Sequence, residues 1–173
     1  MSDIAKAAGI SRQALYLHFR TRAELLIAAT LHLDKVQRGP ERLIPSRKAK
    51  TGLHRLQAFV DGWADYIPDI YGVAKALLAM ADTDEAAALA WGQRMQDMRE
   101  GCQSAVLALQ RDGQLVVDLS AEQATDLLWT LLSVRNWEQL VQTCGWSQED
   151  YKHHMQGLAK RMLVVCDRVI GIQ

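Results

Sequence analysis

Apolar side chains recur at helical spacing along most of the chain, whereas the alternation typical of strands is weak. The one β-branched run, QLVVDL at 114–119, is short. Capping residues and glycines divide the apolar pattern into eight predicted helices, at 2–8, 12–18, 21–37, 51–67, 69–80, 83–112, 121–143 and 148–170. The pattern therefore predicts an all-α protein.

Polar caps and glycines mark the predicted boundaries. Ser11 and Thr21 are typical first-turn caps, and Glu24 is the capping-box partner expected for Thr21. Gly9 follows the first helix, where a residue of positive φ commonly ends a helix. The stretch RGPERLIPSRKAK, 38–50, combines glycine, proline and basic residues and is predicted to be a linker. We expect two domains, over residues 1–40 and 41–173.

The last predicted helix carries two apolar stripes. One stripe steps by three and four residues through Tyr151, Met155, Leu158, Met162, Val165 and Val169, and the adjacent one holds Leu163, Cys166 and Ile170. Two stripes favour one face turned to the core and one turned to a partner chain. Together with Leu128 and Leu132 of helix 121–143, they predict a four-helix interface in a two-fold homodimer. The alternative is a helix covered entirely by its own chain.

The composition shows that charge is unevenly distributed along the chain. The formal net charge is zero, yet residues 1–50 hold ten Lys and Arg against four Asp and Glu. This basic first third favours a polyanion partner at one end, although solvated helix faces would give the same pattern. No membrane-length apolar run and no secretion signal is present, so we expect a cytoplasmic protein. The three cysteines form no CxxC pair and are expected to be free thiols.

A short helix, a glycine-containing turn and a second capped helix predict a helix-turn-helix near the N-terminus. Small alanines allow the two helices to approach closely, and the second helix exposes Arg12, Gln13, Tyr16 and His18. Arginine pairs with guanine and glutamine with adenine, while tyrosine and histidine suit phosphate oxygens. Tyr16 and His18 could instead be packing residues with exposed tips.

The segment SDIAKAAGISRQALYLHFRTRAELL, 2–26, resembles the DNA-binding segment of the TetR family of bacterial transcriptional regulators. The stretch WEQLVQTCGWSQEDY, 137–151, is similar to a late helix junction of many members. The resemblance implies a DNA-binding domain over residues 1–40 and a ligand-binding and dimerisation domain over 41–173. It further implies a homodimer that binds a palindromic double-stranded DNA operator, usually as a repressor released by a small molecule. It places Ser11, Arg12, Gln13, Tyr16 and His18 on the recognition helix, and Arg22 at a phosphate contact. It also implies a helix before Ser2 that this sequence does not contain.

Aromatic and methionine side chains at helical spacing are candidates for a ligand pocket. They are Phe59, Trp63, Tyr66, Trp91, Met95 and Met98. Such side chains line adaptable apolar pockets, so a small apolar effector is expected, although most stripes of this kind are core.

No metal, cofactor or catalytic site is expected. His153 and His154 are adjacent on a helix and point about 100° apart, so they do not readily share one ion. No nucleophile–base constellation or glycine-rich phosphate loop is present, and we expect no enzyme activity. The leading interpretation is a dimeric DNA-binding repressor without membrane association. The alternative is a dimeric all-α ligand-binding module whose shortened head no longer binds DNA.

Overall fold

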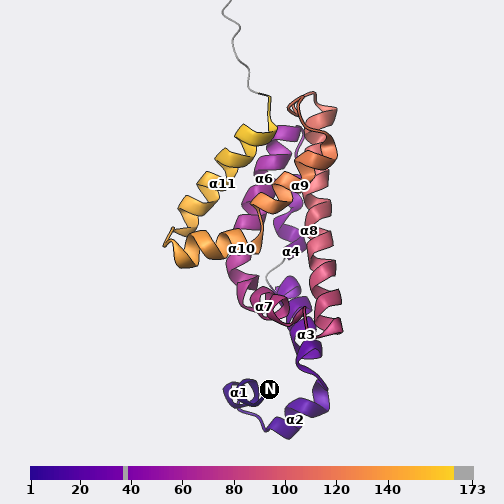
Figure 1. Ribbon diagram of the computed structural model, residues 1–173, viewed down its shortest axis with the longest axis vertical. Coiled ribbons are helices and arrows are strands. Elements are labelled where there is room, and N and C mark those ends of the chain that lie inside the picture. Colours follow the sequence, from indigo (N-terminus) through magenta and orange to yellow (C-terminus); the bar gives the residue numbers. More distant parts are fainter. Residues whose placement is uncertain (37–38, 166–173) are drawn as a thin grey trace, which may run out of the picture. The chain divides into compact units, whose positions relative to one another are not determined.

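The computed structural model describes residues 1–36 and 39–165, with backbone alone at Gly39 and Pro40. This part of the chain is built from helices joined by short turns (Figure 1). They are α1 (Ser2–Ala7), α2 (Arg12–His18), α3 (Arg22–Val36), α4 (Gly39–Arg42), α5 (Ile44–Lys48), α6 (Gly52–Ala64), α7 (Ile67–Met80), α8 (Glu85–Arg111), α9 (Ala121–Leu131), α10 (Val134–Trp137), the π-helix η1 (Glu138–Thr143) and α11 (Gln148–Leu163). The all-α prediction is confirmed. Among the described residues, no helix combines the length and the apolarity needed to cross a bilayer.

The region predicted as a linker is helical instead. Its described residues form α4 and α5, and Pro45 lies in the first turn of α5. A proline there breaks no internal hydrogen bond, because the first amides of a helix have no partner within it. The hydroxyl of Ser46 donates to the carbonyl of Arg55 at 3.0 Å, which fastens α5 to α6.

Helix 121–143 was predicted as one element, and the structure breaks it. Helix α9 ends at Leu131, and the Ser133 hydroxyl accepts the amide of Asn136 to begin α10. The side chain of Asn136 donates to the carbonyls of Thr130 (2.7 Å) and Leu131 (3.2 Å). These bonds satisfy carbonyls that the end of a helix leaves unpaired, so the break is stabilised locally.

The last helix is also shorter than predicted, because α11 ends at Leu163. Val164 forms an antiparallel bridge with Leu115, from the weak strand signal at 114–119. The amide of Val116 donates to Leu163 at 3.0 Å, and that of Val165 donates to Gln114 at 2.9 Å. The apolar stripe therefore leaves the helix before Val165. Cys166, Val169 and Ile170 lie outside the described residues.

The chain forms two compact units. The head unit combines the described residues of Met1–Gln37 with Asp69–Met95, and the body unit combines those of Arg38–Pro68 with residues from Gln96 onward. Helix α8 is continuous, and its residues up to Met95 belong to the head unit. These two units are defined by how closely their own residues pack together. The division into two functional domains at residue 40 remains a prediction.

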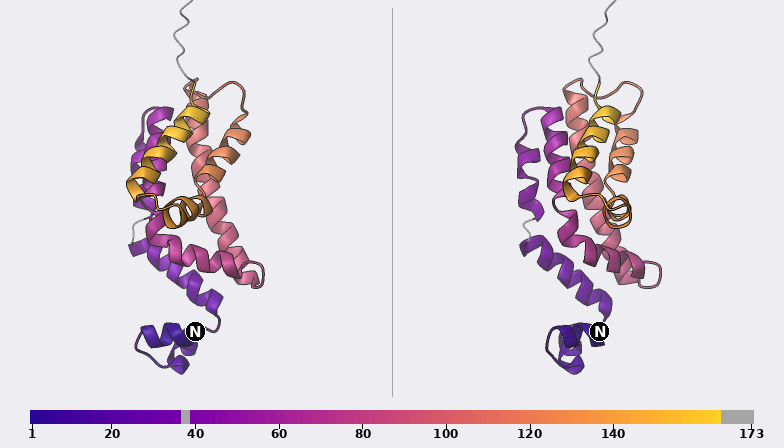
Figure 2. Two further views of the ribbon diagram at one scale, coloured as in Figure 1. Left: turned by 60° about the vertical axis from the view of Figure 1, so that its left-hand side comes forward. Right: turned by 90° about the vertical axis from the view of Figure 1, so that its left-hand side faces the viewer.

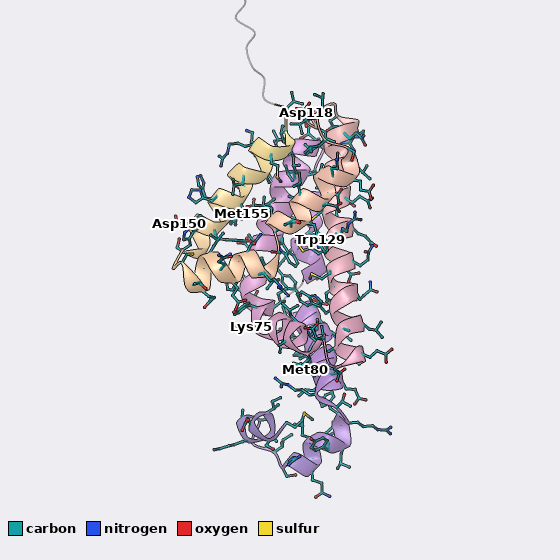
Figure 3. The ribbon with its side chains drawn as sticks, viewed as in Figure 1. Lys75, Met80, Asp118, Trp129, Asp150 and Met155 are labelled. Atoms are coloured by element: carbon teal, nitrogen blue, oxygen red, sulfur yellow. The ribbon has the colours of Figure 1, made fainter. Side chains whose placement is uncertain are left out.

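The body unit is a helical bundle in which α6, the second part of α8, α9 and α11 lie alongside one another (Figure 2). Helix α11 packs mainly on α6 and also contacts α9. The core of the bundle contains side chains from all four helices, among them Leu56, Leu109, Leu128, Tyr151 and Met155. Met155 is labelled on α11 in Figure 3 and is 2% exposed.

The head unit has its own apolar cluster. Ala23 and Leu26 of α3 pack with Leu77 of α7 and Ala87 of α8. Asp34, in the last turn of α3, forms an ion pair with Arg94 of α8. Helix α3 is therefore held to α7 and α8 by both apolar contacts and charge.

Candidate nucleic-acid interface and ligand site

A glycine turn joins the first two helices of the head unit. Gly9 has φ of 67°, a conformation that glycine adopts without strain. The amide of Ile10 donates to Ala5 at 3.0 Å, and that of Gly9 donates to Lys6 at 3.2 Å. These two bonds are those of a Schellman motif, which ends α1 and turns the chain toward α2.

Helix α2 begins at the predicted cap. The hydroxyl of Ser11 accepts the amide of Ala14 at 3.0 Å, and the backbone of Ser11 is extended. On the inner side, Leu15 of α2 is 4% exposed and Ala5 of α1 is 2% exposed, so these two side chains form the contact between the helices. Ile4 and Phe19 are only half-buried around them.

Three polar candidates share one face of α2. At about 100° per residue, Arg12, Gln13 and Tyr16 fall within an arc of about 100°, whose centre lies about 110° around the helix from Leu15. All three are exposed, and the Arg12 guanidinium lies 5.4 Å from the centre of the Tyr16 ring. This contact holds the Arg12 side chain along the helix surface rather than leaving it free.

The other DNA candidates lie outside that face. His18 is exposed at the end of α2, more than about 100° around the helix from Arg12 and Gln13. Its ring is 6.5 Å from the ring of Phe19. Arg22 is exposed at the first position of α3. The hydroxyl of Thr21 accepts the amide of Glu24 at 3.0 Å, as predicted, but the Glu24 carboxylate accepts from the amide of Arg20.

Leu17 is a surface residue that the sequence reasoning missed. Its side chain is 81% exposed, although it lies in the middle of α2, about 40° from Gln13. An exposed leucine among polar side chains can contact a thymine methyl group in a major groove. The signal in the sequence is a leucine that does not fit the buried side of a short helix.

The six ligand candidates are divided between the two units. Phe59, Tyr66 and Met98 are buried in the body unit, where Trp63 is half-buried. Trp91 and Met95 are half-buried in the head unit. The indole of Trp63 donates to the carbonyl of Leu132 at 2.7 Å, and its ring lies 6.2 Å from that of Tyr66. These two aromatic side chains are thus engaged within the bundle.

A cavity of about 330 Å³ opens in the body unit, between α5, α6 and the second part of α8. Phe59 is the single ligand candidate that lines it. Its other walls are largely polar, with Arg47 and Arg55 on one side and Asp97 and Glu100 on α8. Sequence reasoning missed these polar residues because their helices meet only in the fold.

The candidate interface residues are unequally exposed. Leu128, Leu132 and Tyr151 are fully buried in their own chain, and Met155 is 2% exposed. Such side chains serve the core of the bundle and have no surface left for a partner. Met162 is half-buried, whereas Leu158 and Val165 are 39% and 42% exposed. Of the interface candidates that the structure describes, only the last three retain surface that a second chain could cover.

The two described cysteines differ in burial, and the two adjacent histidines contact each other. Cys102 is fully buried, which raises the pKa of its thiol to about 12, and Cys144 is exposed. The rings of His153 and His154 are 5.4 Å apart, and His154 also lies against Trp146. Within residues 1–36 and 39–165, no three His, Cys, Asp or Glu side chains come together as metal ligands.

Comparison with known proteins finds similarity to bacterial transcriptional regulators. Residues 1–29 match the model of the bacterial regulatory proteins of the tetR family. The chain is 30% identical over 146 residues to the HTH-type transcriptional regulator CymR of Pseudomonas putida. That alignment covers 77% of this chain, which spans 64% of the relative's length.

Solved structures share the fold. A transcriptional regulator from Saccharomonospora viridis in complex with choline has a TM-score of 0.77 at 16% identity, covering 95% of this chain and 86% of that one. A TetR-family regulator from Rhodococcus sp. has a TM-score of 0.65 at 22% identity, covering 94% and 86%. Residues 1–29 thus match the tetR family of bacterial regulatory proteins, and the chain shares the fold of solved TetR-family regulators. These likenesses do not favour a ligand-binding module that has lost its DNA-binding head.

Proposed function

We propose that the protein is a homodimeric, DNA-binding transcriptional repressor that a small-molecule effector releases from a palindromic operator. One observation carries this proposal: Arg12, Gln13 and Tyr16 are exposed together on the second helix of a helix-turn-helix. This helix lies within the segment that matches the tetR family model.

The proposed DNA contacts divide into two kinds. Arg12 and Gln13 read base edges, since their side chains pair in two places with guanine and adenine. Ser11, Tyr16, His18 and Arg22 donate to phosphates and fix the position of α2 on the duplex. Leu17 adds an apolar contact beside Gln13.

Release by an effector requires a ligand that binds two states of the protein unequally. Helix α8 contributes Arg94 to the ion pair with Asp34 on α3, and residues further along α8 line the body cavity. We propose that occupation of the body shifts α8 and α3, and so changes the spacing of the two recognition helices in the dimer. The choline complex of the Saccharomonospora viridis regulator supports a small-molecule site in this fold.

The test is binding of the full chain to duplex DNA that flanks its own gene, followed by fluorescence anisotropy at two salt concentrations. Arg12→Ala and Gln13→Ala should each cost about 1–3 kcal/mol for the operator and weaken its preference over unrelated DNA. Arg22→Ala should lower affinity for both DNAs and reduce the salt slope by about one. Lys160→Ala, an exposed charge on α11, is the matched control.

Either of two outcomes would reject the assignment of these residues. The first is unchanged affinity and preference in both Arg12→Ala and Gln13→Ala. The second is an equal loss in the Lys160→Ala control, because a general charge effect would then account for the binding.

A further inference from the structure

The lining of the cavity in the body unit includes Arg55, whose guanidinium group is incompletely paired. The Nε atom of Arg55 is buried and has no hydrogen-bond partner in the described part of the chain. The backbone of Arg55 is held in place, since its carbonyl accepts the buried hydroxyl of Ser46 at 3.0 Å. A buried donor without an acceptor costs stability, and a ligand that supplies an acceptor removes that cost.

Charges on the cavity wall are separated by helix. Arg47 and Arg55 come from α5 and α6, whereas Asp97 and Glu100 come from α8. Glu100 accepts the side-chain amide of Gln96 at 3.0 Å, and its carboxylate keeps further acceptor positions. The lining thus presents a donor fork on one wall and a carboxylate on the other, with no formal net charge.

We propose that this cavity binds a small zwitterion, an amino carboxylate whose two charges are joined by a short apolar chain. The carboxylate pairs with the Arg55 guanidinium, where planar two-point hydrogen bonding is strongest. The ammonium group faces Glu100, and the apolar chain lies on Phe59 and Leu43. A dianion such as inorganic phosphate is disfavoured, because the acidic wall on α8 repels it.

This inference rests on the proposed function for its regulatory consequence, but binding itself requires no DNA. The first experiment is isothermal titration calorimetry of the full chain with a series of zwitterions of increasing length: 3-aminopropionate, 4-aminobutyrate, 5-aminopentanoate and 6-aminohexanoate. The length that binds best reports the distance between the groups that bind the carboxylate and the ammonium. We expect one optimal length, with pentanoate and pentylammonium each binding about tenfold more weakly or worse. The optimal zwitterion should then weaken operator binding in the anisotropy assay.

Substitutions assign the two ends of the ligand. Arg55→Gln should weaken the binding of both the zwitterion and pentanoate about tenfold. Arg55→Lys should have an affinity between those of the wild type and Arg55→Gln, because lysine keeps the charge but lacks the two-point donor geometry of arginine. Glu100→Gln should weaken binding of the zwitterion and leave the affinity for pentanoate unchanged, because pentanoate has no ammonium group. Arg135→Gln, an exposed arginine on α10, should change neither. If Arg55→Gln does not fold, Arg55→Lys and Glu100→Gln still decide the matter.

Three results would overturn the proposal. One is no binding of any zwitterion by the wild type up to about 10 mM. Another is binding that Arg55→Lys and Glu100→Gln leave intact. The third is pentanoate or phosphate binding as tightly as the best zwitterion. Failure of the proposed function would instead appear as absent operator binding by the ligand-free protein.

Discussion

Tyr151 places a polar atom in the core of the body unit. Its side chain is fully buried, its hydroxyl has no hydrogen-bond partner among the described residues, and burial raises the pKa of the phenol. The ring contributes apolar contacts, while the unpaired hydroxyl works against them.

Tyr151→Phe should therefore leave stability unchanged or increase it by up to about 1 kcal/mol, since it removes only the unpaired hydroxyl. Urea unfolding followed by circular dichroism measures the change. A loss of stability greater than about 1 kcal/mol would show that the hydroxyl has a partner, such as an internal water.

Asp112 links two helices at the residue scale. It pairs with Arg111 at 2.7 Å and accepts the amide of Gly52 at 2.6 Å, at the start of α6. The hydrogen bond from Arg111, followed by that from Gly52, lowers the pKa of Asp112 below its usual 3.8. Near that pH the unfolded chain binds more protons than the folded one, so stability rises with pH.

Asp112→Asn should consequently reduce stability most above about pH 5, where the carboxylate is charged in both states. The difference from wild type should shrink as the pH falls below 3.8 toward the lowered folded pKa. Thermal melts from about pH 2.5 to about pH 7, which span the usual carboxylate pKa, measure this difference, and Asp118→Asn at an exposed position is the control. A difference that does not depend on pH would contradict this explanation.

At the scale of elements, the contact between α6 and α8 depends on Gly52. A Cβ atom at this position would lie 2.6 Å from backbone atoms of Ala108 and Leu109. Backbone atoms inside a helix cannot move aside as a flexible side chain can, so the helices would have to separate.

Gly52→Ala should destabilise the protein by about 1–3 kcal/mol or more, as expected for overpacking. Gly92 provides the matched control, since it lies within α8 and a Cβ there meets nothing within 4 Å. Gly92→Ala should stabilise by about 0.5–1 kcal/mol, because alanine favours a helix interior. Equal effects of the two substitutions in urea unfolding would contradict the close approach at Gly52.

Helix starts were more predictable than helix ends. Ser11, Ser120 and Ser147 each cap the helix that follows, because a side-chain oxygen reaches an amide two or three residues on. The break after α9 depends on Asn136 reaching back to Thr130 and Leu131. The end of α11 depends on a backbone bridge to Leu115, which is distant in sequence.

At the scale of the whole molecule, the proposed dimer rests on a smaller apolar surface than the sequence pattern indicated. Of the described candidates, Leu158, Met162 and Val165 retain surface, while the others belong to the core. Leu158→Arg should shift the protein toward monomer without a comparable loss of stability, because Leu158 is already 39% exposed in the single chain.

Sedimentation velocity over a range of concentrations measures this shift. Leu89→Arg is the matched control, since Leu89 is 68% exposed and belongs to the head unit. A monomeric wild type would contradict the proposed dimer. If the Leu158→Arg variant is as fully dimeric as the wild type, Leu158 does not lie in the dimer interface.

The sequence by itself determined the helical class, the helix-turn-helix and the exposed face of α2. These features depend on local periodicity, on a cap at Ser11 and on positive φ at Gly9, which neighbours in the chain decide. Only the tertiary structure decided which apolar stripes are core, where α11 ends and which polar side chains meet around Arg55. Burial and pairing at these positions depend on helices far apart in the chain, and no local pattern carries that information.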